Sequence, residues 1–255
     1  MKLYENIFFD GCVGLGDAIV MNAIVHKYAR NCDKLYYPSS PQFLDTLTCL
    51  YQDYPNIEVW RFYNPLQEEI FVETNHLFRV RSTGLITSEI HRIGCEPERI
   101  QVHWPQQIYE NFDIPFKERY LGFKMPKHIE GCEELYQTLT QGDDDYVLVH
   151  RYASDHPTGI PIDIPGFRAQ KGLPPKKIIE IQEGQTTNML QYKTLIERAS
   201  EIHCIPSSFF NLVDSMITDI PAVAFFHDIR KNSLMKVNSN WNNHRWDIIT
   251  YGIRV

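Results

Sequence analysis

Short apolar runs alternate along this chain with longer stretches in which apolar residues recur at helical spacing, and this alternation restricts the possible folds most strongly. Residues 6–10, 34–38 and 57–60 form the first three apolar runs, and residues 17–30 and 43–51 between them have helical periodicity. Strands separated by helices are typical of βαβ units, whose strands run parallel. We therefore predict an α/β fold.

The same alternation restarts in the second half of the chain, around an acidic loop at residues 141–145. We expect strands at residues 146–150, 176–182, 201–206 and 221–227, and helices at residues 129–139, 188–200 and 207–216. Two such series predict two Rossmann-like lobes, residues 1–140 and 141–255, that face each other across a central cleft. Parallel sheets bind ligands at the carboxyl ends of their strands. The candidate binding loops therefore follow Asp10, His150, Gln182 and Pro206.

The middle of the chain, residues 63–123, has a less regular pattern. Its apolar runs predict strands at residues 68–72 and 76–80. Helical spacing predicts helices at residues 85–94 and 105–115, the second of them closed by a proline.

The net charge of −7 argues against a nucleic-acid partner, because such proteins neutralise phosphates with clustered lysines and arginines. The one basic stretch, residues 168–177, is short. We interpret it as a solvated loop, with contact to a phosphate or an anionic surface as the alternative.

Metal-binding patterns are missing from the sequence. The six cysteines include no C-x-x-C pair, and the ten histidines have no H-E-x-x-H or H-x-H spacing. Three aspartates at residues 143–145 precede a predicted strand, which indicates a solvated turn. We expect neither a metal nor a cofactor.

The amino terminus lacks a secretory pattern, since Asp10 and Gly11 interrupt the first apolar run. No apolar segment reaches the roughly 20 residues that a transmembrane helix needs. Together with the scattered cysteines, these features lead us to expect a cytoplasmic protein without a transmembrane segment.

A glycine-rich turn, FFDGCVGLGD at residues 8–17, joins the first strand to the first helix. A dinucleotide fingerprint would need a third small residue where Ile19 stands, and a Walker loop would need a lysine. Phe8 occupies the place of the nucleophile in an aspartyl-phosphate motif that resembles the haloacid dehalogenases. Asp17 remains, as a helix N-cap or as a functional carboxylate that a sugar could approach over the glycines.

Two later segments present groups that suit an anion. Arg151 follows His150 at a predicted strand end, where its guanidinium could bind a diphosphate in a bidentate manner or form an ordinary surface salt bridge. His150 itself is equally consistent with a structural histidine. Ser207 and Ser208 open a helix, where free N–H groups attract anions, although Ser207 could serve only as a cap.

These segments, in this order, resemble the GT-B-fold glycosyltransferases. The turn GLGDAIV is similar to the G-D-x-[LIV] turn of the heptosyltransferase family, with matches at Gly16, Asp17 and Ile19. The helix that begins at Ser207 resembles the nucleotide-binding stretch of the same superfamily, which includes fucosyltransferases. Their H-x-R-R-G-D motif corresponds here to HRYASD, without the second arginine and the glycine.

The resemblance implies inverting, metal-independent transfer of a sugar from a nucleotide-activated donor to the hydroxyl group of a glycan or another acceptor. It assigns roles as follows: Asp17 as general base, Gly14 and Gly16 in the acceptor-side loop, Arg151, Ser207 and Ser208 on the donor diphosphate, and His150 and Glu183 on the donor ribose, base or loop. The alternatives are a nucleotide-sugar epimerase or hydrolase with this fold, and a catalytically silent nucleotide- or carbohydrate-binding module.

Overall fold

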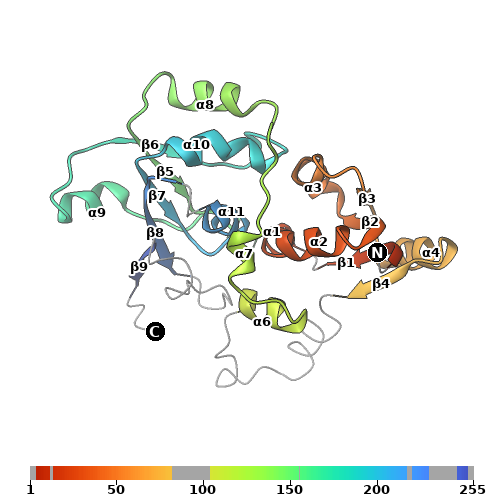
Figure 1. Ribbon diagram of the computed structural model, residues 1–255. Helices are drawn as coiled ribbons and strands as arrows, with labels where there is room; N and C mark the ends of the chain where they lie inside the picture. Colours follow the sequence, from red (N-terminus) through yellow and green to blue (C-terminus); the bar gives the residue numbers. More distant parts are fainter. Residues whose placement is uncertain are drawn as a thin grey trace. The chain divides into compact units, whose positions relative to one another are not determined.

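The chain forms two compact units, Met1–Ile129 and Glu130–Val255 (Figure 1). The computed structural model describes residues 4–11, 14–81, 104–154, 156–216, 220–229 and 246–251. The helix expected at residues 85–94 lies outside them. The boundary falls about ten residues before the one that we placed after residue 140, so the helix that precedes the acidic turn belongs to the second unit.

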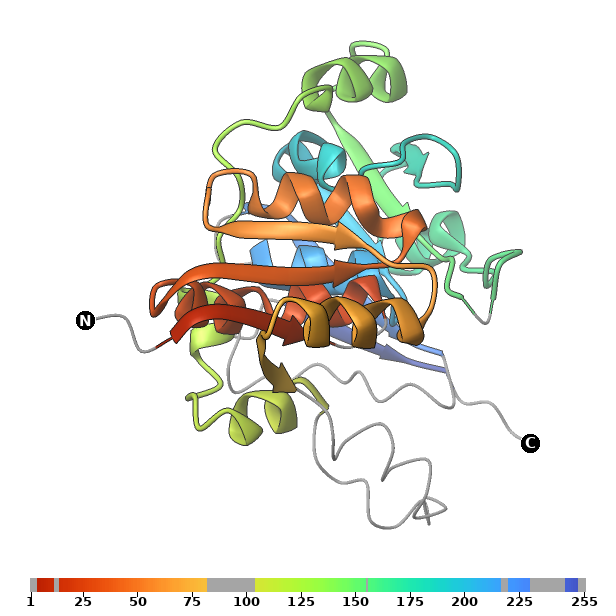
Figure 2. The same cartoon turned by 90° about the vertical axis from the view of Figure 1, so that its right-hand side faces the viewer.

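The first unit contains a parallel four-stranded sheet with the strand order β3-β2-β1-β4 (Figure 2). Its strands are β1 (Tyr4–Asp10), β2 (Cys32–Ser39), β3 (Ile57–Arg61) and β4 (Phe78–Arg81). This is the strand order of half a Rossmann fold, which confirms the prediction for this part of the chain.

Short helices connect these strands: α1 (Leu15–Val20), α2 (Asn22–Ala29), η1 (Pro41–Phe43), α3 (Leu44–Tyr51), α4 (Pro65–Thr74), α6 (Trp104–Asn111) and α7 (Glu118–Leu121). The single helix predicted at residues 17–30 is two helices separated at Met21, and it begins two residues earlier than expected.

The strand predicted at residues 68–72 is wrong, because these residues lie within α4. The Asn64 side chain accepts a hydrogen bond from the Gln67 N–H (3.1 Å), and Pro65 occupies the first turn. An asparagine cap followed by proline is a helix start signal. This signal was present in the sequence, but we interpreted the short apolar run that follows it, residues 68–72, as a strand.

Both faces of the first sheet are covered, since Ile7, Phe8 and Phe9 in β1 are fully buried. Phe8 contacts Phe71 of α4 on one face, with ring centroids 6.2 Å apart. Phe9 contacts Tyr28 of α2 on the other face, at 5.7 Å. An apolar strand flanked by helices on both sides is typical of parallel sheets.

The second unit contains a parallel five-stranded sheet with the order β6-β5-β7-β8-β9. Its strands are β5 (Tyr146–His150), β6 (Lys177–Glu180), β7 (Glu201–Cys204), β8 (Val223–Asp228) and β9 (Trp246–Thr250). Counted within the unit, this is the order 2-1-3-4-5 of flavodoxin-like sheets. The sequence analysis missed β9.

Helices pack on both faces of this sheet as well: α8 (Cys132–Thr140), α9 (Ile164–Gln170), η2 (Met189–Tyr192), α10 (Lys193–Arg198) and α11 (Ser208–Met216). Phe210 of α11 packs on Phe226, with centroids 4.7 Å apart. Phe167 of α9 packs on Phe225, the preceding residue of the same strand, at 5.0 Å. Adjacent strand residues point to opposite faces, so α11 and α9 cover different sides. None of the described helices is long and apolar enough to cross a bilayer.

Candidate functional site

The strand orders locate one candidate binding position in each sheet. Ligands of open parallel sheets bind beyond the carboxyl ends of the strands, where the strand order reverses. In the first unit the order reverses between β1 and β4, so the glycine turn after β1 lies at this position. In the second unit it reverses between β5 and β7, whose carboxyl ends lead to His150 and Ser207.

Asp17 lies in the first turn of α1, in partly buried surroundings. It is the third residue of the helix, whereas Gly14 is the N-cap, so the interpretation of Asp17 as the N-cap itself is wrong. Its Oδ2 accepts a hydrogen bond from the Gly14 N–H (3.2 Å). Burial raises the pKa of Asp17 to about 6, against a smaller lowering by this hydrogen bond. A carboxyl group with such a pKa can both accept and release a proton near neutral pH.

The glycines of the turn make room for neighbouring side chains. A Cβ atom on Gly14 would lie 3.2 Å from Asp17 Oδ2, which would crowd the carboxylate. A Cβ atom on Gly11 would lie 2.8 Å from the Tyr37 hydroxyl oxygen and 3.0 Å from Met21 Cε. Gly16 is buried inside the first helical turn. Packing around β1 therefore accounts for Gly11, and the missing side chain of Gly14 leaves room for the Asp17 carboxylate.

A second acidic group ends β1, and its partner was not found from the sequence. Asp10 Oδ2 lies 3.8 Å from Arg79 Nε, and Arg79 Nη1 lies 2.6 Å from Glu69 Oε1. The Arg79 guanidinium also sits over the Phe8 ring, 5.5 Å from its centroid. β4 and α4 thus place a cation beside the end of β1. The sequence RVR at residues 79–81 was a local signal for this cation, but its position beside Asp10 depends on the pairing of β4 with β1.

His150 and Ser207 come together at the switch point of the second sheet. Ser207 Oγ accepts the Phe210 N–H (3.1 Å), so it caps α11 as expected. The same hydroxyl lies 3.2 Å from His150 Nδ1, and the His150 ring stacks on Phe209 with centroids 4.9 Å apart. Burial lowers the pKa of His150 to about 4, so its imidazole is neutral at pH 7.

Ser208 is the first residue of α11 and is partly exposed, in contrast to its buried neighbours Ser207 and Phe209. The first N–H groups of a helix have no partner within the helix and carry partial positive charge. Since Ser207 already takes the N–H of Phe210, the N–H groups of Ser208 and Phe209 are the ones in this first turn that could bind an anion.

Arg151 is held by a carboxylate that the sequence analysis overlooked. Its Nε donates to Glu180 Oε1 (2.7 Å), and its Nη2 donates to Glu180 Oε2. Tyr152 also donates to Glu180. Burial would raise the pKa of Glu180, but these hydrogen bonds outweigh it and hold the pKa below its usual value. Two of the three guanidinium nitrogens are thus occupied, and Nη1 has no hydrogen bond within the described residues.

Glu183 does not join this group. Its side chain is exposed in the turn that follows β6, and it makes no contact within the described part of the chain. The carboxylate at the end of β6 itself, Glu180, is the one that reaches Arg151. The carboxylate that contacts Arg151 therefore lies three residues before Glu183, the residue that the sequence analysis had selected.

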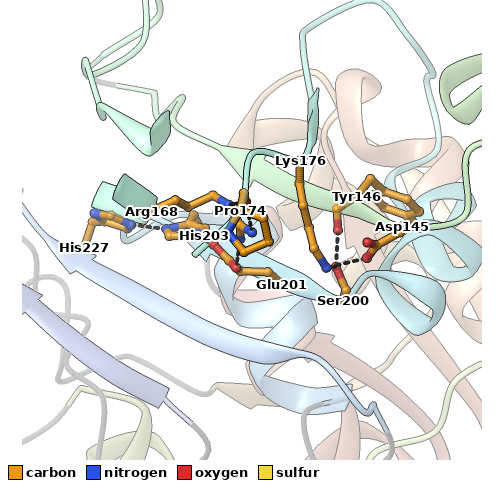
Figure 3. Close-up of polar contacts among 9 residues, drawn as sticks. All are labelled: Asp145, Tyr146, Arg168, Pro174, Lys176, Ser200, Glu201, His203 and His227. Atoms are coloured by element: carbon orange, nitrogen blue, oxygen red, sulfur yellow. Dashed lines mark hydrogen bonds and ion pairs between the residues drawn. The ribbon is translucent and has the colours of Figure 1, made fainter. Parts of the chain in front are cut away.

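The basic stretch at residues 168–177 is solvated only in its middle, where residues 169–175 are exposed, whereas Arg168 and Lys176 at its two ends are held by fixed partners (Figure 3). Arg168 is 3% exposed and forms an ion pair with Glu201, while its Nε donates to the Pro174 carbonyl oxygen (3.1 Å). Lys176 donates to Ser200 Oγ (2.9 Å) and pairs with Asp145. These cations tie α9 and the turn before β6 to β7, and they are not available to a ligand.

A chain of buried hydrogen bonds extends from this ion pair across the sheet. Glu201 Oε1 lies 2.7 Å from His203 Nε2, and His203 Nδ1 lies 2.7 Å from His227 Nε2. His227 Nδ1 lies 2.6 Å from the Tyr251 hydroxyl oxygen. Because an ionised Glu201 can only accept, His203 donates to it through Nε2. Burial lowers the pKa of His227 to about 3, so its imidazole is neutral.

Similarity searches with the whole chain found solved structures only. No family model matches, and no curated protein matches. The crystal structure of the glycosyl transferase family 9 protein from Veillonella parvula DSM 2008 is similar over 98% of this chain and 88% of that chain, with a TM-score of 0.56 and 13% sequence identity. The structure of E. coli heptosyltransferase WaaC with ADP-2-deoxy-2-fluoro heptose is similar over 93% of this chain and 94% of that chain, with a TM-score of 0.46 and 12% sequence identity.

At 13% identity the similarity concerns the fold. The similar region covers 98% of this chain, so it includes both units and the parallel sheet of each. The α/β fold with two Rossmann-like units is therefore confirmed, and the chain has the fold of this glycosyl transferase family 9 structure.

Proposed function

We propose that this protein is a glycosyltransferase that moves a sugar from a nucleotide-activated donor to a hydroxyl acceptor, with inversion and without a metal ion. The observation that carries the proposal is Asp17, a partly buried carboxyl group with a pKa of about 6 at the switch point of the first sheet. The fold shared with a glycosyl transferase family 9 structure supports it.

In this reaction the Asp17 carboxylate accepts the proton of the acceptor hydroxyl as the acceptor oxygen attacks the anomeric carbon. The bond from that carbon to the diphosphate oxygen breaks, and its electron pair leaves with the nucleoside diphosphate. Attack opposite to the leaving group inverts the anomeric centre. General-base assistance of this kind contributes roughly 100- to 10,000-fold to the rate.

The second unit is our proposed donor side, and the first unit the acceptor side. The N–H groups at the start of α11 would bind the diphosphate, with the Ser208 hydroxyl and Arg151 Nη1 beside them. Glu180 would orient Arg151 for this contact, since a guanidinium fixed on two sides loses little freedom on binding. His150 and Glu183 would contact the donor ribose, base or loop.

We place the reaction in the cytoplasm. The thiols of Cys32 and Cys132 are buried and donate to the carbonyl oxygens of Ala29 and Leu190, so both are in the reduced form that this compartment maintains.

A catalytically silent carbohydrate- or nucleotide-binding protein is the second candidate. The observation that favours it is the Arg151–Glu180 pair, which neutralises the one arginine at the proposed diphosphate position. An epimerase or hydrolase with this fold would need the same diphosphate position without an acceptor.

The experiment that tests the proposal combines a ligand screen with product analysis. Thermal shifts with UDP, GDP, ADP and CMP identify the donor nucleotide class, and the corresponding nucleotide sugars are then followed by NMR with and without a glycan acceptor. A new glycosidic linkage supports the transferase. Free sugar or an epimerised donor would indicate the other enzymes, and binding without turnover would indicate the silent module.

A further inference from the structure

An open hollow with a volume of about 450 Å³ lies in the first unit, where β3 ends and α4 follows. We call it the Trp60 hollow. Its lining includes Trp60, Arg61, Tyr63, Gln67, Phe71 and Asn75. This volume falls within the range of small-molecule sites, which is about 300–1,000 Å³.

The walls of the hollow present aromatic surface to solvent. Trp60 is 41% exposed and Tyr63 is 61% exposed. The indole is held in place from two sides, since Phe71 packs on it with centroids 4.5 Å apart and its Nε1–H donates to Glu58 Oε2 (3.2 Å). Exposed apolar surface that is rigid and concave marks a binding site in many proteins.

Polar groups surround this aromatic surface and offer both donors and acceptors. Gln67 Oε1 accepts the Tyr63 N–H (2.8 Å), and within the described residues its NH₂ group has no hydrogen-bond partner. Asn75 Nδ2 donates to the Phe71 carbonyl oxygen (2.8 Å), and among the same residues the Asn75 side-chain oxygen accepts no hydrogen bond. The Arg61 guanidinium lies over the Tyr63 ring, 5.1 Å from its centroid.

The surrounding charges disfavour an anionic ligand. Lys34 is paired with Glu58 (2.6 Å), and Arg79 with Glu69 (2.6 Å). Helix α4 adds Glu68 and Glu73, so Arg61 has no surplus of positive charge around it. A phosphorylated ligand or an anionic membrane would meet these carboxylates.

A neutral sugar matches each of these properties. One face of a sugar ring consists of C–H groups, which pack on an aromatic face whose electron density is negative. The hydroxyl groups at the rim of the ring both donate and accept hydrogen bonds, as the amides of Gln67 and Asn75 do.

One wall of the hollow, residues 60–63, lies at the carboxyl edge of the sheet, as does the glycine turn that leads to Asp17. Phe8 in β1 is paired with Tyr36 in β2, and Tyr36 with Glu58 in β3, so β1 and β3 end at the same level. Two strand spacings separate them, which is about 10 Å. A glycan chain of a few units can span this distance along the carboxyl edge of the sheet.

We propose that the Trp60 hollow binds an outer, uncharged sugar unit of a glycan acceptor, separate from the unit that reacts at Asp17. This inference rests on the proposed function, because it makes the glycan the acceptor. Sugar binding in the hollow can nevertheless be measured without any donor, so the two proposals can fail independently.

The test uses the full chain and a panel of neutral linear hexasaccharides, namely malto-, cello-, xylo- and chitohexaose. Binding is measured by saturation-transfer NMR and calorimetry in the absence of nucleotide sugar. We expect one of them to bind, and Trp60→Ala to weaken this binding about tenfold, equivalent to about 1.4 kcal/mol. Trp60→Phe should restore most of the affinity, because a phenyl ring keeps an aromatic face. Leu66→Ala is the matched control, since Leu66 is 68% exposed on α4 but does not line the hollow.

Three outcomes would overturn the inference: no hexasaccharide binds, Trp60→Ala and Leu66→Ala bind equally well, or Trp60→Ala abolishes self-association measured by sedimentation instead of glycan binding. The last outcome would make the hollow a contact between copies of the chain. Melting curves of each variant verify folding.

The two proposals can be distinguished by their failures. If hexasaccharide binding depends on Trp60 but the protein has no transferase activity, the proposed function and the role of the hollow as an acceptor subsite are refuted. The conclusion that the hollow binds a sugar would remain.

Discussion

Asp17 in the first unit and Arg151 in the second follow the carboxyl ends of β1 and β5, and they differ in how their charge is compensated. Within the described residues Asp17 has one side-chain hydrogen bond, from the Gly14 N–H, and burial raises its pKa to about 6. In the second unit Arg151 is paired with Glu180, and the pKa of His150 is lowered to about 4, so that the groups near the start of α11 are neutral or neutralised.

This difference separates two kinds of task. A carboxyl group without a compensating cation is unstable in its ionised form, and that instability makes it a useful base. Groups that are neutralised by fixed partners do not exchange protons near pH 7, but they hold donors in place for a ligand. We therefore expect proton transfer to depend on the first unit and donor binding on the second.

The largest expected effect is the loss of turnover in Asp17→Asn. Asparagine keeps an oxygen for the Gly14 N–H but cannot accept a proton, so transfer should fall by about 100- to 10,000-fold. Rates of sugar transfer measured with the donor identified by the ligand screen test this. Asp45→Asn is the control, because Asp45 also lies in the first turn of a helix and is exposed.

The pH profile provides a second measurement of the same prediction. The base must be ionised, so kcat/KM of the unmodified protein should rise as the pH passes through about 6 and then level off. Residual activity of Asp17→Asn should lack this rise. Equal turnover of Asp17→Asn and the unmodified protein would leave Asp17 with a structural role only.

Breaking the buried ion pair of the second unit should give the largest loss of stability. Glu201→Ala leaves Arg168, which is 3% exposed, without its carboxylate, and we expect unfolding to become easier by about 3–5 kcal/mol. Urea unfolding followed by circular dichroism measures this. The control Glu197→Ala removes a half-exposed partner of Lys193 and should cost at most about 0.5 kcal/mol.

A double variant separates the charge from the packing. Arg168→Met combined with Glu201→Leu removes both ions and keeps apolar volume, so it should recover much of the stability lost in Glu201→Ala. Similar losses in Glu201→Ala and Glu197→Ala would mean that the buried pair has no special structural role.

Removal of the Asp17 charge should instead increase the stability of the protein. The pKa of Asp17 is about 6 when folded and 3.8 in its reference state, so the folded protein loses stability as the pH rises from about 4 to 6. Asp17→Asn should therefore be more stable than the unmodified protein by about 1–2 kcal/mol at pH 7.5, after allowance for solvent around a partly exposed group. The gain should vanish near pH 4. Urea unfolding at both pH values decides, and a destabilised Asp17→Asn at pH 7.5 would contradict the expectation.

The smallest effect concerns donor affinity. Arg151→Ala removes the charged Nη1 group, and we expect the nucleoside diphosphate found in the screen to bind about tenfold more weakly by calorimetry. Glu180→Gln should have a weaker effect, because it loosens Arg151 without removing it. Unchanged affinity in Arg151→Ala would leave the main-chain N–H groups of α11 as the anion site.

Local sequence signals were sufficient to predict features that depend on a single strand or helix. The apolar residues 7–9 and 146–149 are consecutive in the sequence, and each run forms the part of a strand that is buried on both faces. Ser207 was recognisable as the start of α11, since a cap needs only its own helix. The glycine turn before the first helix was also recognisable, but the place of Asp17 as the third residue of that helix depends on backbone geometry.

Contacts between distant segments were beyond the sequence analysis. The strand β9 exists because it pairs with β8, and its short apolar run is no stronger than that of residues 68–72, which form a helix. Arg168 and Glu201 stand 33 positions apart, and Arg151 and Glu180 stand 29 apart, so no local pattern links them.

The sequence alone determined the kind of fold and the neighbourhood of the candidate site, because hydrophobic periodicity and capping are local properties of the chain. Only the tertiary structure decided which charges are free to act. Burial raised the pKa of Asp17, and partners brought by other strands neutralised Arg151 and Arg168. The free energy of a charge depends on its surroundings in space, and in this protein those surroundings come from residues far away in the chain.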